Sequence, residues 1–258
     1  MAHNTAELHI DLNADLGETT AGNPVSDDAA MVGIVSSANV ACGFHAGDPH
    51  AIAQTVAAAH SHGVSIGAHV GYNDLRGFGR RFIDYVPEEL AAETLYQIGA
   101  LDALCRAEGT QVRYVKPHGA LYNTIVHHKA HAKAVIDGIK AFSPDLAVML
   151  LPGGVAVDIA EKAGMRVIRE AFADRGYNPD GTLVSRREPN AVLHDPAAVA
   201  ERVLQVASTG SVTAIDGTEV KVQAESVCVH GDSPGSVELT RSVVAKLRDE
   251  NITIASVL

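Results

Sequence analysis

The chain has 258 residues, of which 47% are hydrophobic, 20% charged and 4% aromatic, and its formal net charge is −11. This composition is typical of a folded protein with a large core and excludes a disordered or collagen-like chain. The acidic balance argues against a surface for nucleic acid or an anionic membrane, because both need a basic patch. We expect a soluble, cytoplasmic protein with reduced cysteines, since no segment resembles a signal peptide or membrane span.

Short apolar segments alternate with helical segments along the whole chain. The segments with the pattern of buried strands are 8–17, 35–42, 64–71, 113–123, 146–154, the first part of 166–181, and 226–235. The segments with helical periodicity are 49–63, 87–109, 127–143, 155–164, 196–210 and 236–251. A hairpin that turns at Asp216–Gly217 is expected within 211–226, and a short terminal strand within 252–258.

Alternating units of this kind form parallel strands joined by right-handed crossovers. We therefore predict an α/β fold, a seven-stranded parallel βα barrel of distorted TIM-like shape, with one domain over residues 1–258. An open, doubly wound sheet is the alternative. Such a sheet usually carries a glycine-rich phosphate turn after its first strand, whereas here that turn reads NADLGE (13–18).

Polar side chains follow most of the predicted strands, at the end of a βα barrel where active sites are built. Four of the 13 histidines stand there, together with a lysine that precedes a Pro-His pair. The candidate catalytic residues are Asp15, His45, His69, Lys116, His118, Asp174 and His230. The histidines and Asp15 suit either general acid–base catalysis or a metal site. Because no HExxH motif is present, the sequence leaves both interpretations open.

A second set of residues suits the binding of substrate or phosphate. Its members are Asn13, Asn39, Arg80, Arg81, Arg175 and Asp232. The segment RGFGRR (76–81) places two glycines between arginines, which favours close approach to an anion, although a solvated basic loop has the same pattern. No Walker A or GxGxxG motif occurs, so a nucleotide would bind in another way or to another chain. His127, His128 and His131 open a predicted helix and are expected on its solvated face.

Six segments of the chain resemble the signature segments of the LamB/YcsF family. They are DLNADLGE (11–18), SANVACGFHAGDP (37–49), GAHVGYNDLRGFGRR (67–81), KPHGALYN (116–123), EAFADRGYNPDGTLVSR (170–186) and VHGDSPG (229–235). They follow in order from about residue 9 to the C-terminus, so the resemblance covers nearly the whole chain. It implies a seven-stranded barrel of the glycoside hydrolase/deacetylase type.

The resemblance also implies an activity, the ATP-coupled hydrolysis of 5-oxo-L-proline to L-glutamate, with release of ADP and phosphate. The family is expected to act with two partner subunits, B and C, with ATP as co-substrate and a divalent metal left open. On this interpretation the cationic side chains would hold phosphate and carboxylate, and the imidazoles and carboxylates would move protons. A metal-dependent deacetylase or amidohydrolase that acts alone is one alternative, and a non-catalytic subunit that binds 5-oxoproline is another.

Overall fold

The computed structural model describes residues 8–186, 188–189, 191–231 and 235–258. Seven strands form a barrel: β1 (His9–Leu16), β2 (Ser37–Ala41), β3 (Ser65–His69), β4 (Tyr114–Val115), β5 (Ala147–Leu150), β6 (Val167–Phe172) and β9 (Ser226–Cys228). Each strand pairs in parallel with the next, and β9 pairs with both β6 and β1, which closes the barrel. The predicted seven-stranded parallel barrel is confirmed and the open sheet is excluded. The single domain over residues 1–258 stays a prediction.

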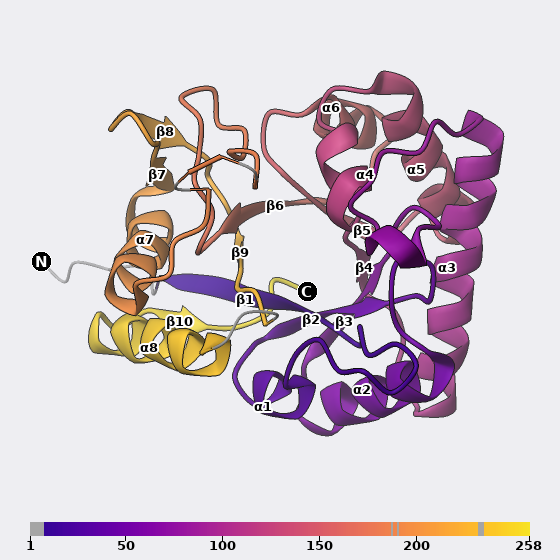
Figure 1. Cartoon of the computed structure of the whole chain (residues 1–258), viewed down its shortest axis with the longest axis horizontal. Coiled ribbons are helices and arrows are strands. Elements are labelled where there is room, and N and C mark those ends of the chain that lie inside the picture. The colour runs from indigo at the N-terminus through magenta and orange to yellow at the C-terminus, as the bar shows by residue number, and fades with distance from the viewer. Residues whose placement is uncertain (1–7, 187, 190, 232–234) are drawn as a thin grey trace, which may run out of the picture.

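Helices surround the strands (Figure 1). They are α1 (Asp28–Val32), α2 (Pro49–Ser61), α3 (Pro87–Ala107), α4 (Gly119–Thr124), α5 (Lys129–Phe142), α6 (Val155–Lys162), α7 (Pro196–Thr209) and α8 (Ser236–Asp249), with a 3-10 turn η1 (Leu75–Gly77). The Asp48 side chain caps α2 by accepting from the Ala51 N–H, and Pro49 fills the first helical position. Among the described residues, none of the helices combines the length and the apolar character needed to cross a bilayer.

The predicted hairpin and the predicted terminal strand are both confirmed. The hairpin of β7 (Ser211–Thr213) and β8 (Glu219–Lys221) is antiparallel, and Gly217 supplies the positive φ of 88° that its turn requires. Strand β10 (Thr253–Ile254) pairs in parallel with the beginning of β1.

The predicted strand at 113–123 is wrong over most of its length, and α1 and η1 are not predicted at all. Strand β4 ends at Val115, and α4 begins at Gly119. Pro117 has no N–H to continue the ladder, and Gly119 has a φ of 52°, so the chain turns out of the sheet there. This turn places Lys116 and His118 at the C-terminal end of the barrel, where both side chains are buried.

Residues of β1 alternate between two environments, as a strand requires. Leu12 and Leu16 belong to the large apolar core. Asp11 and Asn13 are bonded instead to side chains of the neighbouring barrel strands: Asp11 accepts from Ser37 Oγ at 2.7 Å, and Asn13 donates to Ser226 Oγ at 2.8 Å. The barrel interior next to β1 is therefore polar and fully buried, and it supports the side chains above it.

Gly67 on β3 is required by its neighbour. A Cβ at this position would overlap the buried ring of Tyr114, whose hydroxyl donates to Asn39 Oδ1 at 2.6 Å. We expect Gly67→Ala to lower the free energy of unfolding by about 1–3 kcal/mol, because the ring cannot move without breaking that bond. The matched control is Gly99→Ala on α3, where a Cβ meets no atom within 4 Å and helix propensity predicts a gain of up to about 1 kcal/mol. Equal effects of the two substitutions in urea unfolding would contradict this packing argument.

Candidate active site

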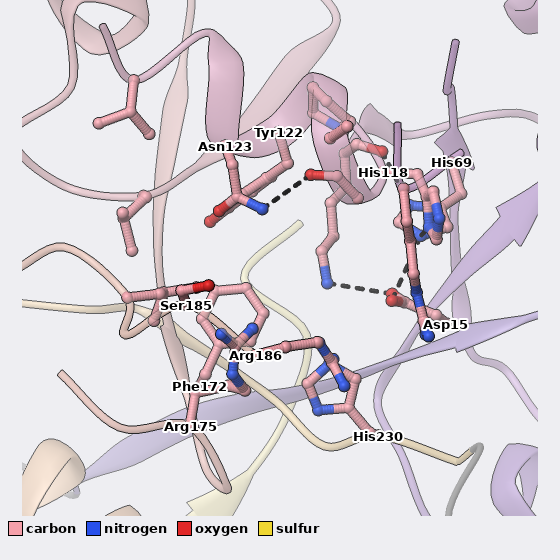
Figure 2. Close-up of a pocket in the computed structure, with 18 of the residues that line it drawn as sticks. Asp15, His69, His118, Tyr122, Asn123, Phe172, Arg175, Ser185, Arg186 and His230 are labelled. Atoms are coloured by element: carbon pink, nitrogen blue, oxygen red, sulfur yellow. Dashed lines mark hydrogen bonds and ion pairs between the residues drawn. The ribbon is translucent and has the colours of Figure 1, made fainter. Parts of the chain in front are cut away.

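A cavity of about 650 Å³ opens at the C-terminal ends of the barrel strands. The predicted site residues that line it are Asp15, His69, Arg80, Lys116, His118, Arg175 and His230. Figure 2 shows Asp15, His69 and His118 on one side of this cavity and Arg175, Arg186 and His230 on another. Side chains that are far apart in the sequence thus meet here because parallel strands end at the same rim.

Lys116 forms the floor of the cavity. Its ammonium lies 2.8 Å from Glu170 Oε1 and 3.0 Å from Asp15 Oδ1. It also donates to Asn13 Oδ1 and to Cys228 Sγ, each at 3.1 Å. The lysine is only 2% exposed, so a cation is held in a fixed position by two carboxylates.

These charges change one another's proton affinity. Burial opposes the charged form of Lys116, but Asp15, Cys228 and Glu170 raise its pKa well above the usual range. Burial also opposes the ionised form of Asp15, yet His69 and Lys116 hold its pKa well below the usual range. Both groups are therefore charged at neutral pH, and the site presents an ammonium and a carboxylate side by side.

Three imidazoles and a carboxylate form the wall beside Asp15. His69 Nδ1 lies 2.9 Å from the Lys116 carbonyl, and His118 Nε2 lies 2.8 Å from the Phe78 carbonyl. The remaining nitrogens, His69 Nε2 and His118 Nδ1, are 3.0 Å apart. His45 stacks on His118 with ring centroids 3.8 Å apart, and its Nε2 lies 3.1 Å from Glu18 Oε1.

Burial is the main cause of the shifted pKa values of His45 and His118 in this wall. It lowers the pKa of His45 well below the usual range, and His69 adds to the effect. It also lowers the pKa of His118 well below the usual range, with further contributions from the His45 and His69 rings. His45 and His118 are therefore neutral imidazoles at neutral pH.

On the other side of the cavity, His230 lies between an acid and a cation. Its Nδ1 is 2.7 Å from Asp174 Oδ1, and its Nε2 is 3.0 Å from Arg186 Nη2. A guanidinium only donates, so Nε2 carries the lone pair and the Nδ1–H group donates to Asp174. This is the geometry of a general base held in one tautomer by a carboxylate.

The contribution of Asp174 to the stability of the fold depends on pH. Burial opposes its ionised form, but His230 and Arg186 hold its pKa below the usual range. A carboxyl group whose pKa is lower in the folded than in the unfolded chain stabilises the fold at every pH above its unfolded pKa of about 3.9. This stabilisation is lost as the pH falls from the unfolded pKa through the folded pKa. We expect Asp174→Asn to lower the Tm at pH 7. The difference in Tm between the variant and wild type should become smaller only below about pH 4. A difference that is independent of pH in thermal unfolding would contradict this assignment.

Several predicted residues do not reach the cavity. Asn13 and Asn39 are fully buried beneath it, where Asn39 Nδ2 donates to Asn13 Oδ1 at 2.7 Å and to Asp15 Oδ1 at 2.8 Å. Arg81 is 64% exposed and pairs with Asp74 away from the cavity. Asp232 lies outside the described residues. The contact of these residues with substrate or phosphate stays a prediction, and the two asparagines act here as supports of Asp15 and Lys116.

Arg175 and Arg80 make different contacts in the cavity. Arg175 donates to the Ala191 carbonyl at 3.2 Å and to the Val184 carbonyl at 2.6 Å, and burial lowers its pKa to about 10. Both carbonyls belong to the segment between β6 and α7, so Arg175 holds this segment in place. Arg80 lines the cavity, with its guanidinium 4.9 Å from the centroid of the Phe78 ring.

Sequence reasoning missed Arg186. This side chain lies in a loop, 14 residues after the last residue of β6, so no strand end marks it. The one available signal was its place as the last residue of the segment 170–186 that carries the family resemblance. Glu18 and Glu170 follow or end predicted strands, but the sequence assigned them no catalytic role.

Two groups of side chains have the spacing of metal ligands. One contains Glu18, His45, His69 and His118, whose ligand atoms lie within 4.8 Å of one another. The other contains Asp15, Cys228 and His230. The ammonium of Lys116 lies within 3.1 Å of both Asp15 and Cys228, so a cation already neutralises the second group. The first group is the better candidate for a metal.

Comparison with known proteins agrees with this architecture. The family model described as LamB/YcsF family matches residues 10–258. A protein of Corynebacterium jeikeium, named as the A subunit of 5-oxoprolinase, is 70% identical over 258 residues, which is the whole of both chains. A protein of the same name from Kocuria rhizophila is 60% identical and covers 96% of this chain and 98% of its own.

A solved structure has the same fold. It is the lactam utilization protein from Thermus thermophilus, with a TM-score of 0.92 and 43% sequence identity. The match covers 96% of this chain and 99% of that one. The chain described here is a member of the LamB/YcsF family.

Proposed function

We propose that this chain is the A subunit of an ATP-dependent 5-oxoprolinase, a hydrolase that opens the cyclic amide of 5-oxo-L-proline to give L-glutamate, ADP and phosphate. The observation that carries the proposal is the 70% identity, over the full length of both chains, to a protein named as the A subunit of 5-oxoprolinase. Two partner subunits, B and C, and a cytoplasmic location, where ATP is available, are part of the same proposal.

The cavity suits the two polar ends of 5-oxoproline. Arg186 and Arg80 line it and carry the charge that a substrate carboxylate or a phosphate needs. Lys116 and Asp15 present opposite charges on the floor, where the lactam C=O and N–H require a donor and an acceptor. Asp15 and His230 offer atoms within 4.8 Å of each other, so a ligand held on this floor would lie beside His230.

The ring-opening step needs a water nucleophile and a proton for the leaving nitrogen. In the proposed sequence, ATP phosphorylates the lactam oxygen and releases ADP, and a first water attacks the activated carbon. The ring nitrogen then leaves as the protonated amine, which gives the acyl phosphate of glutamate, and a second water displaces phosphate to form the carboxylate. His230 Nε2 takes the proton from water, and Asp174, 2.7 Å from Nδ1, stabilises the resulting imidazolium. When a substrate carboxylate draws the Arg186 guanidinium away, the Nε2 lone pair becomes free for water.

The direct test is the release of ADP and glutamate from 5-oxoproline and ATP, first with this chain alone and then with the B and C proteins of the same organism. We expect turnover only in the complete mixture. No turnover in the complete mixture would refute the proposed function, and full turnover by this chain alone would refute the need for partners.

A second candidate function is that of a metal-dependent amidohydrolase acting alone. The cluster of Glu18, His45, His69 and His118 favours it, because imidazoles and a carboxylate at this spacing suit a catalytic zinc ion. Turnover of simple amides or lactams by this chain alone, without ATP and abolished by a chelator, would favour this function over the first.

A further inference from the structure

The hydrogen bonds of His69 and His118 determine where their protons lie. A backbone carbonyl only accepts, so the Lys116 carbonyl requires a proton on His69 Nδ1, at 2.9 Å. The Phe78 carbonyl likewise requires a proton on His118 Nε2, at 2.8 Å. In neutral imidazoles the other two nitrogens, His69 Nε2 and His118 Nδ1, then carry only lone pairs.

These two lone-pair nitrogens face each other at 3.0 Å. Two carboxylates stand beside them, with Asp15 Oδ2 at 3.3 Å from His69 Nε2 and Glu18 Oε1 at 3.7 Å from His118 Nδ1. Glu18, His69 and His118 thus offer ligand atoms within 4.8 Å of one another, with Asp15 beside His69, in a wall where His69 and His118 are 1% and 5% exposed. Such an arrangement repels itself unless a cation lies between the atoms.

The cation can be a proton or a metal ion, and the surroundings favour the metal. The separations of 3.0–3.7 Å bracket the distance of about 3.3 Å expected between ligands of a tetrahedral ion bound at about 2.0–2.1 Å. Carbonyl acceptors on the outer nitrogens are also the usual partners of metal-bound histidines.

His45 has a different part in this cluster. Its ring lies 7° from parallel to the ring of His118, with centroids 3.8 Å apart. Imidazole lone pairs lie in the ring plane, so two stacked parallel rings do not aim at one ion. The geometry makes His45 a positioning residue that donates from Nε2 to Glu18 Oε1 at 3.1 Å and thereby orients that carboxylate.

We propose that His69 Nε2, His118 Nδ1 and the Glu18 carboxylate bind one divalent transition-metal ion of the zinc class, with Asp15 beside it. Two imidazoles and a carboxylate match the ligand preference of such ions, and three protein ligands leave a position open. Glu18, His69 and His118 line the cavity, so the open coordination position of the metal would face the space in which a substrate binds. A role in polarising a lactam carbonyl or water rests on the proposed function; the binding of metal does not.

The test is metal binding by the full chain without an affinity tag, stripped with a chelator and titrated with Zn²⁺ and Co²⁺. We expect one ion per chain, a rise in Tm with Zn²⁺, and visible Co²⁺ absorption of a four- or five-coordinate site. His69→Ala and His118→Ala should each abolish binding. His45→Phe, which keeps the stacked ring but cannot donate, should weaken it by about 10–100-fold. His60→Ala, an exposed histidine of α2, is the matched control and should bind like wild type.

Two outcomes would overturn the metal site. One is wild-type affinity no greater than that of His69→Ala, with wild type and variant both folded by circular dichroism. The other is an N–H···N proton between His69 and His118, seen by nitrogen NMR in the presence of saturating Zn²⁺. Both readouts use this chain alone, so failure of the metal site is distinguishable from failure of the proposed reaction in the mixture with B and C.

Discussion

Replacing Lys116 with methionine is expected to lower the free energy of unfolding by about 3–5 kcal/mol and to abolish the proposed activity. The ammonium lies 3.0 Å from Asp15 and 2.8 Å from Glu170, and the Glu170 side chain has no exposed surface. Removing one partner of a buried ion pair leaves the other charge without compensation, which costs more than the pair itself contributes. Methionine keeps most of the volume, so the loss reports charge rather than packing. Urea unfolding followed by circular dichroism measures it, since the chain has no tryptophan.

The control for this prediction is the double variant Lys116→Met with Glu170→Gln. Neutralising Glu170 removes part of the uncompensated charge, so the double variant should be more stable than Lys116→Met alone. A loss equal to the sum of the two single losses would show that the two side chains are not coupled. The fold would then depend on Lys116 through its packing or its other hydrogen bonds.

Replacing His230 with glutamine is expected to lower kcat in the complete mixture by about 10²–10⁴-fold. The imidazole is the one predicted catalytic histidine that is held between a carboxylate and an arginine, with Asp174 at 2.7 Å and Arg186 at 3.0 Å. Glutamine fills a similar space but accepts a proton from water far less readily. KM for 5-oxoproline should change much less, because His230 acts on water rather than on the substrate carboxylate.

The matched control is His194→Gln, which removes an exposed histidine that does not line the cavity and should leave kcat unchanged. Thermal unfolding of the two variants checks that both are folded. If His230→Gln keeps more than about half of the wild-type kcat while His194→Gln is normal, another group must take the proton. Such a result would concern the role of His230 alone, since neither the ion pair at Lys116 nor the metal site depends on it.

Local patterns in the sequence were sufficient for the order of the barrel strands. The apolar run of β5 and the helix signals Asp48 and Pro49 act over a few residues, so they can be read without the fold. The same logic placed Asp15, His69, Lys116 and His118 at strand ends, and they line one cavity. The strand predicted at 113–123 failed because the apolar pattern continues through Pro117 and Gly119, where the backbone leaves the sheet.

The residues that were predicted less well are those whose burial the sequence pattern did not show. Asn13 and Asn39 follow the same strand-end pattern as Asp15 but are fully buried and do not line the cavity. His131, expected on a solvated helix face, is 1% exposed, with its Nδ1 2.7 Å from the Tyr72 hydroxyl. The segment that contains Tyr72 comes from a distant part of the chain and covers that face, which no helical periodicity can show.

The sequence by itself determined the family, the parallel barrel and the end of the barrel that carries the chemistry, because these follow from short-range patterns and from segments in order. Only the tertiary structure decided which nitrogen of each histidine carries its proton, because that depends on carbonyls such as those of Lys116 and Phe78. It also decided that Lys116 is paired with both Asp15 and Glu170 and that Arg186 reaches His230. These contacts join residues up to 101 positions apart, and their energies depend on distance and burial, which a linear pattern does not contain.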